Sequence, residues 1–367
     1  MQCLILYSFF VLATSQRKEI LLIVSIIFIL TINTVSAESY SYDSAEYLYT
    51  THQYSKCLEY FEKYYKKSGG SYEENVRAQL LIFKTSIANH EFTKLSKQID
   101  EYLGNAPLRV DDKYRFLLLK SEFHLKQSDV TNAKKAFFMA DSLYKAEGFQ
   151  QTAIENATFL YLKAKLNLVD SKEETINLLL KSLSLVPKEN KFFVEILRSL
   201  GVKMIVNSKL DSGLYYLEQG ISHNLRFQKK DSIGLIKLYL QKANALFRKR
   251  NIKESIKMYE ELLRPLIFNP HSVNENSYYF LELEFYRLSI ILYRYIHDYE
   301  RTIEYGSEFL TKAPAFYPNN SFRYGEVYRD IANSYLKLGQ LDLFVKYIDK
   351  SVALLVSKEE YQSYVFF

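Results

Sequence analysis

The 367-residue chain is poor in the residues that make turns, with six prolines and eleven glycines. Both fall well below average usage, which argues against a turn-rich all-β fold. Tryptophan is absent, but 32 tyrosines and 25 phenylalanines raise the aromatic content to 16%. A chain this aromatic is not expected to be disordered. Its abundant Leu, Lys, Glu and Ile suit helices, and its length allows two ordinary domains or one long array.

Cysteine is also scarce. The two cysteines are Cys3 and Cys57, and Cys3 lies before or within a segment that resembles a targeting signal. We therefore expect Cys57 to be alone in the mature chain, where it makes neither an internal disulfide nor a zinc site. Its expected role is that of a small buried residue.

Charge of one sign is not concentrated anywhere. The formal net charge is +6, from 48 Lys and Arg against 42 Asp and Glu, and the acids are interleaved with the bases along the chain. Nucleic-acid binders usually gather such charge on one face. The sequence therefore favours solvated helix faces and predicts no nucleic-acid partner.

The usual motifs of catalysis and cofactor binding are missing. The six histidines lie at positions 52, 90, 124, 223, 271 and 297, and no two are three or four residues apart. Phosphate-binding, dinucleotide-binding, nucleophile-elbow and zinc-protease motifs are all absent. Nothing singles out a pair of carboxylates for acid–base chemistry. We expect a protein that is not an enzyme and that uses no metal or cofactor.

The N-terminal 37 residues are built like an export signal. Arg17 and Lys18 precede the apolar run Ile20–Ile32, and the small residues of "VSA" lead up to Glu38. The apolar core of 13 residues is short for a membrane-spanning helix, which needs roughly 20. The upstream segment "MQCLILYSFFVLAT" is itself apolar, so an uncleaved anchor is the alternative. Either way, residues 38–367 are expected outside the cytoplasm, in the periplasm or anchored to the inner membrane facing it.

A spacing of small and large residues repeats through the rest of the chain. In "YRDIANSYLKLGQLDLFVKYIDKSVALL", one helix face carries residues at offsets 0, 3, 4 and 7, Gly339 breaks the helix, and a second amphipathic helix follows. The position that holds a small residue in most units recurs at 57, 95, 133, 175, 213, 255, 302 and 344. Small residues there allow two antiparallel helices to approach, and one pair cannot bury its own apolar faces, so the pairs must stack.

This pattern resembles the tetratricopeptide repeat (TPR) family over roughly residues 40–360. The resemblance rests on Tyr328, Ala332, Tyr335, Gly339 and Tyr347 in the last unit, on Gly201, Gly213 and Gly220 in the fifth, and on the closing residues Pro187 and Pro314. It implies an all-α solenoid of about eight helix-turn-helix repeats that forms a right-handed superhelix with a concave groove lined by the first helices. Two features depart from the family: the period is 38 to 47 residues, and Phe344 occupies a small position.

The resemblance also implies which side chains face the groove. Cations, amides and aromatics at these positions suit an extended peptide, an acidic segment or a C-terminal carboxylate. The candidate ligand-binding residues of the groove are Lys237, Asn244, Arg248, Arg287, Arg294, Arg329, Asn333 and Lys337. Leu240, Phe247 and Tyr295 are expected to lie beside them.

Three functions compete at this point. The first is a non-enzymatic scaffold that binds a protein or peptide partner in the groove and meets the membrane only through its N-terminal segment. The alternative is the sensor part of a membrane-bound TPR regulator that lacks its output domain. A hydrolase is the third, and it would need a clustered polar pocket that the sequence does not show.

Overall fold

The computed structural model describes residues 41–51, 53–65, 70–92, 94–127, 129–147, 151–227, 232–268, 276–317 and 321–355. The predicted signal peptide or anchor, residues 1–37, lies outside these ranges. The described residues form helices and their connections, with no strand among them. None of the described helices is both long and apolar enough to cross a membrane.

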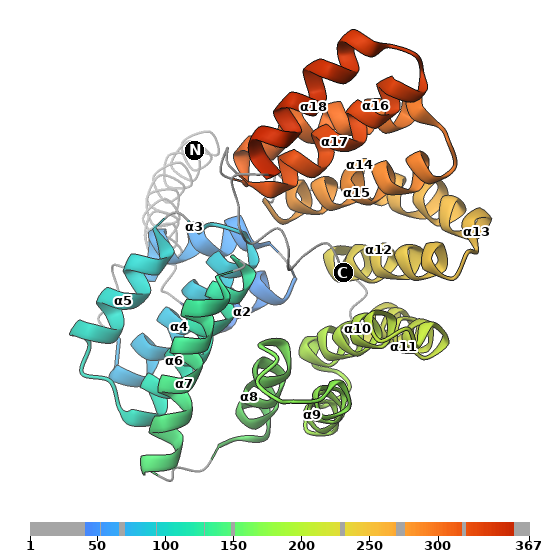
Figure 1. The fold of residues 1–367 in the computed structure, drawn as a ribbon. Coiled ribbons are helices and arrows are strands. Elements are labelled where there is room, and N and C mark those ends of the chain that lie inside the picture. Colours follow the sequence, from blue (N-terminus) through green and yellow to red (C-terminus); the bar gives the residue numbers. More distant parts are fainter. Residues whose placement is uncertain are drawn as a thin grey trace, which may run out of the picture.

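The helices form eight antiparallel pairs that follow one another along a curved array (Figure 1), so the predicted α-solenoid is confirmed. We call the two members of each pair the first and the second helix. The pairs are α2 (Tyr42–Thr50) with α3 (Tyr54–Tyr64), α4 (Tyr72–Ala88) with α5 (Leu95–Asn105), α6 (Val110–Lys126) with α7 (Val130–Glu147), α8 (Ala153–Lys165) with α9 (Lys172–Ser184), α10 (Lys191–Val206) with α11 (Leu210–Phe227), α12 (Ser232–Arg248) with α13 (Ile252–Lys257), η2 (Met258–Leu263) and α14 (Arg264–Phe268), α15 (Asn276–Tyr295) with α16 (Tyr299–Lys312) and the short η3 (Ala313–Ala315), and α17 (Phe322–Lys337) with α18 (Leu341–Leu355).

The predicted small position lies where the two helices of a pair cross. Its residue is buried in the first seven pairs, and in two of them its side chain hydrogen-bonds to the first helix. The Cys57 thiol donates to the Ala45 carbonyl at 3.3 Å, and the Ser255 hydroxyl donates to the Ala243 carbonyl at 2.9 Å. Cys57 is thus the small buried residue that the sequence predicts. Phe344, the exception, is only half-buried.

The second helix of the sixth pair is not regular. Residues Met258–Leu263 form a π-helical turn, which adds one residue to the path of the chain. The sequence pattern places Leu262 in the core, seven residues after Ser255. That prediction is wrong, because Leu262 is 43% exposed and Leu263 is fully buried in its place.

In six of the eight pairs, the described part of the turn between the two helices contains one residue in the left-handed region. It is Gly339 in the last pair, with φ of +75°, as the sequence predicts. Earlier pairs place other residues there: His90, Asn167, Ser208, Arg250 and His297. A residue with a Cβ is strained in this conformation, so these turns form at some cost in stability.

The array curves far enough for distant repeats to touch. The Lys191 ammonium of α10 donates to the Tyr54 hydroxyl of α3 at 3.1 Å. The His90 ring, after α4, stacks on Phe280 of α15 with centroids 4.3 Å apart. Tyr54 is 3% exposed and packs in a core cluster formed mainly by α12, η2 and α15. Repeats one, two, five, six and seven therefore meet across the inside of the curve.

Candidate binding surface on the first helices

The inner wall of the curve is built by first helices. Most successive first helices contact one another along the array, and these contacts are more extensive than any between successive second helices. The first helices therefore lie on the short, concave side. Side chains that point away from the second helix line this concave surface, which is where the sequence places its candidate residues.

Three first helices carry the sequence Glu-x-x-Arg at equivalent positions of the repeat. It reads "EILR" at 195–198, "EFYR" at 284–287 and "EVYR" at 326–329. Residues three apart on a helix are neighbours, so each arginine can reach its glutamate. Arg198 donates to both carboxylate oxygens of Glu195, at 2.6 and 3.0 Å. Arg287 donates to Glu284 at 2.9 Å.

The cations of the seventh and eighth repeats share acids across the repeat boundary. Arg294 Nη1 of α15 lies 2.8 Å from Asp330 Oδ1 of α17, and Arg329 also approaches Asp330, at 3.4 Å. Arg323 reaches Glu284 at 3.3 Å. Burial alone would raise the pKa of Glu284, but the charges of Arg287 and Arg323 hold it below its usual value. The positive charge of the candidate groove residues is therefore partly neutralised here, because Arg287, Arg294 and Arg329 all meet carboxylates.

Burial dominates at the remaining acids of this region. It raises the pKa of Asp330, which is 6% exposed at its side chain, in spite of the opposing charges of Arg294 and Arg329. It also raises the pKa of Glu326, against the charges of Arg329, Arg287 and Arg323. An acidic ligand that approaches these arginines must compete with buried Asp330 and half-buried Glu326.

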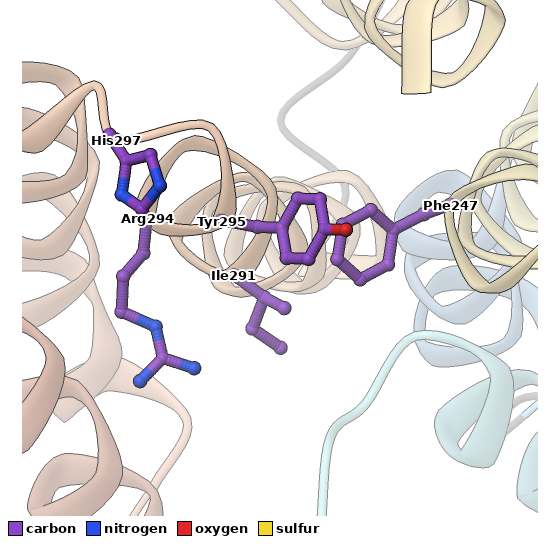
Figure 2. Close-up of a pocket in the computed structure, with 5 residues that line it drawn as sticks. All are labelled: Phe247, Ile291, Arg294, Tyr295 and His297. Atoms are coloured by element: carbon purple, nitrogen blue, oxygen red, sulfur yellow. The ribbon is translucent and has the colours of Figure 1, made fainter. Parts of the chain in front are cut away.

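A cleft of about 700 Å³ opens between the sixth and seventh repeats. Figure 2 shows Tyr295 and Phe247 on one side of it, Arg294 and His297 on the other, and Ile291 between them. The Phe247 and Tyr295 rings meet edge to face, with centroids 5.1 Å apart. Phe247, Arg294 and Tyr295 are residues that the sequence assigns to the groove. The cleft therefore combines an apolar floor with one arginine.

The other predicted residues lie on the first helices α12 and α17 but not in this cleft. Arg248 and Lys337 are exposed, and Lys237, Asn244 and Asn333 are half-buried. Leu240 does not face the groove, because it is 3% exposed and belongs to the core cluster. The sixth repeat thus has no cation at the position that holds Arg198 and Arg287 in its neighbours.

Sequence reasoning missed the charged residues of the middle repeats. Glu195 and Arg198 lie on α10, and Tyr161 of α8 donates to Glu195 at 2.9 Å. Burial alone would raise the pKa of Glu195, but the Arg198 charge holds it far below its usual value. The recurring Glu-x-x-Arg spacing was the signal that would have identified this pair. Among the described residues, no group of His, Cys, Asp or Glu is arranged to hold a metal ion.

No protein-family model matches the chain, and no curated protein matches it. Solved structures do. The apo quorum sensor NprR from B. thuringiensis aligns with a TM-score of 0.57 and 13% identity over 80% of each chain. NprR in complex with its cognate peptide NprX gives 0.55 and 14% identity, over 80% of this chain and 82% of the other.

A third match is a Rap protein complexed with Competence and Sporulation Factor. Its TM-score is 0.58 at 12% identity, over 86% of this chain and 96% of the other. Identities this low show a shared fold and nothing finer. The chain is a helical-repeat protein with a TPR-like fold.

Proposed function

We propose that this protein is a non-enzymatic scaffold that binds an extended peptide or protein segment on the concave surface of its first helices. The observation that carries the proposal is the cleft between α12 and α15, where Phe247, Ile291 and Tyr295 lie beside the Arg294 guanidinium. The NprR and Rap structures support it, because NprR was solved in complex with its cognate peptide NprX and the Rap protein in complex with Competence and Sporulation Factor.

The cleft suits a segment with an apolar side chain next to a carboxylate. Burying one large apolar side chain contributes roughly 1.5–3 kcal/mol. The Arg294 side chain is 37% exposed although it pairs with Asp330, so part of its guanidinium faces solvent. A planar guanidinium has five donors and can serve two carboxylates at once. A C-terminal carboxylate or an acidic side chain is the expected partner of Arg294.

A peptide library with free C-termini, selected on the purified protein, tests this assignment. We expect the selected peptides to lose about tenfold or more in affinity for a Phe247→Ala, Arg294→Gln variant. Glutamine is preferred to glutamate at position 294, because a new charge beside buried Asp330 would unfold the site as well as weaken binding. A rise in the fluorescence anisotropy of the labelled peptide reports binding.

The matched control is a Tyr215→Ala, Arg226→Gln variant, which removes one exposed aromatic and one exposed arginine from α11. Its affinity should stay within about twofold of wild type. Selected peptides that bind the cleft variant as tightly as wild type would place the binding surface elsewhere, and a library without any enriched peptide would argue against peptide binding altogether.

We also propose that residues 1–37 export the protein, on the sequence of that segment alone. N-terminal sequencing of the protein from its native host should find Glu38 first. An intact N-terminus in the membrane fraction would replace cleavage with an anchor. The alternative function is a sensor that signals across the membrane. Such a sensor would bind its peptide ligand on this same concave surface.

A further inference from the structure

A second group of charges lies on the concave surface, away from the cleft. It comprises cationic side chains of α6, α8, α10 and α12, and we call it the inner cation cluster. Its members are Lys126, Lys165, Arg198, Lys203 and Lys237.

Contacts between α8 and α10 bring three of these cations together. Lys203 of α10 donates to the Asn167 side chain at 2.7 Å, two residues after Lys165, so its ammonium lies at the end of α8. Tyr161, one turn before Lys165 on α8, donates to Glu195, which in turn binds Arg198. Lys165 and Arg198 therefore face the same inner edge. Lys126 ends α6 as Lys165 ends the adjacent α8.

Two members of this cluster are paired with carboxylates. Glu195 is occupied by Arg198, and Glu122 lies 3.5 Å from Lys126. Within the described ranges, Lys165 has no ion pair. Burial and the charges of Arg198, Lys203 and Lys126 lower the pKa of Lys165 to about 8. Burial and the charges of Lys126 and Lys237 also lower the pKa of His90 to about 3, so this ring adds no positive charge at neutral pH.

Lysine at the end of a helix is common, because it interacts favourably with the last carbonyl groups. That ordinary role requires only an exposed side chain. It does not explain why Lys165 is half-buried beside Arg198 and Lys203, where like charges repel. Such repulsion is relieved when an anion binds between the cations.

We propose that the inner cation cluster binds the clustered carboxylates of an acidic segment in the peptide ligand. This inference rests on the proposed function and adds a second subsite to it. The cleft then holds an apolar residue, and the cluster holds an acidic stretch of the same segment. Both subsites lie on first helices, α6 to α12 for the cluster and α12 to α15 for the cleft.

Labelled hexaglutamate peptide is the probe, and fluorescence anisotropy reports its binding at low salt and at about 0.15 M ionic strength. We expect a Lys126→Gln, Lys165→Gln, Lys203→Gln variant to bind about tenfold more weakly or worse. A Lys135→Gln, Lys172→Gln, Lys181→Gln variant removes the same charge from α7 and α9, where these side chains are exposed. Its affinity should change less than about twofold.

The Phe247→Ala, Arg294→Gln variant should lose less affinity for hexaglutamate than the Lys126→Gln, Lys165→Gln, Lys203→Gln variant does, because it keeps the whole cluster and hexaglutamate has no apolar side chain for the cleft. Failure of the cluster and failure of the cleft are therefore told apart by which variant loses which peptide. Equal loss in the two triple variants would reduce the effect to net charge and overturn the proposal. Inorganic pyrophosphate that competes more strongly than hexaglutamate would assign the cluster to phosphate and overturn the peptide assignment.

A second measurement does not depend on substitutions. Brief reaction with acetic anhydride near pH 8, followed by mass spectrometry, should modify Lys165 readily, because its lowered pKa leaves much of the amine neutral at that pH. Exposed Lys172 serves as the reference. Hexaglutamate should slow the reaction at Lys165 and leave Lys172 unchanged. Equal rates with and without the peptide would contradict binding at the cluster.

Discussion

The fifth and sixth repeats are neighbours with the same topology, but their two helices approach each other by different means. In the fifth, Gly201 and Gly213 face each other, and a Cβ added at Gly213 would lie 2.5 Å from Ile205 Cγ1 and 3.0 Å from the Gly201 carbonyl oxygen. In the sixth, Ala243 and Ser255 occupy these places, and the serine hydroxyl donates to the alanine carbonyl.

The second helices differ as well. α11 is one regular helix from Leu210 to Phe227, whereas the sixth repeat continues from α13 through the π-helical turn η2 into α14. A small residue therefore fixes where two helices cross, but it does not fix the phase of the residues beyond the crossing. That phase depends on the regularity of the helix, and one added residue in η2 moves Leu263 into the core in place of Leu262.

Substitution of these two leucines gives the largest expected effect. Leu263→Ala should cost about 2–5 kcal/mol of unfolding free energy, because the fully buried side chain leaves a cavity. Leu262→Ala should cost less than about 1 kcal/mol, because that side chain is 43% exposed. Urea denaturation followed by circular dichroism measures both. The reverse order would mean that the sixth repeat contains an ordinary α-helix.

The pairing of helices could be predicted from the sequence because it depends on local spacing. Gly213, Ser255 and Thr302 recur at intervals that survive changes in loop length, and each is buried as predicted. The π turn could not be predicted in this way. Its one trace is the 47-residue interval from Ser255 to Thr302, which a longer loop would explain equally well.

The candidate site was predictable only in part, for a related reason. Arg294 and Tyr295 line the cleft as their repeat positions indicate, since neighbouring repeats share a local geometry. The meeting of Lys191 with Tyr54, or of His90 with Phe280, depends on the curvature summed over several repeats. A small error in each repeat accumulates along the array, so a pattern within one repeat does not reveal contacts across the curve.

A second comparison concerns the glycine of the fifth repeat. Gly213→Ala should cost about 1–3 kcal/mol, because the new methyl group meets Ile205 and the backbone of α10. Gly104 of α5 is the control, since a Cβ there would meet nothing within 4 Å. Gly104→Ala should stabilise the protein by up to about 1 kcal/mol through helix propensity. A Gly213→Ala variant that melts at or above the wild-type temperature would show that α10 and α11 are not in close contact.

The fifth and sixth repeats also differ in charge at one equivalent position, where Glu195 stands in one and Lys237 in the other. The lowered pKa of Glu195 means that the folded protein binds fewer protons there than the unfolded chain. Its contribution to stability is therefore complete above the unfolded pKa, about 4.3, and is lost as the pH falls. The destabilisation by Glu195→Gln should be largest at neutral pH and should shrink below about pH 4. A pH-independent difference between the two proteins would contradict this ion pair.

The smallest expected effect lies in the turns, where Ser208 of the fifth repeat and Arg250 of the sixth both have positive φ. Ser208 is exposed, and glycine adopts this conformation without a clash. Glycine also gives the unfolded chain more freedom, which offsets part of the gain. Ser208→Gly should therefore raise the free energy of unfolding by about 0.5–1 kcal/mol. Arg250→Gly should gain less. The Arg250 guanidinium lies 5.5 Å from the Tyr295 ring centroid and donates to its hydroxyl, and glycine loses both contacts. Urea midpoints of the two variants measure the difference. If Ser208→Gly lowers stability, the left-handed turn of the fifth repeat is not strained. The strain assigned to the sixth-repeat turn at Arg250 would then be in question as well.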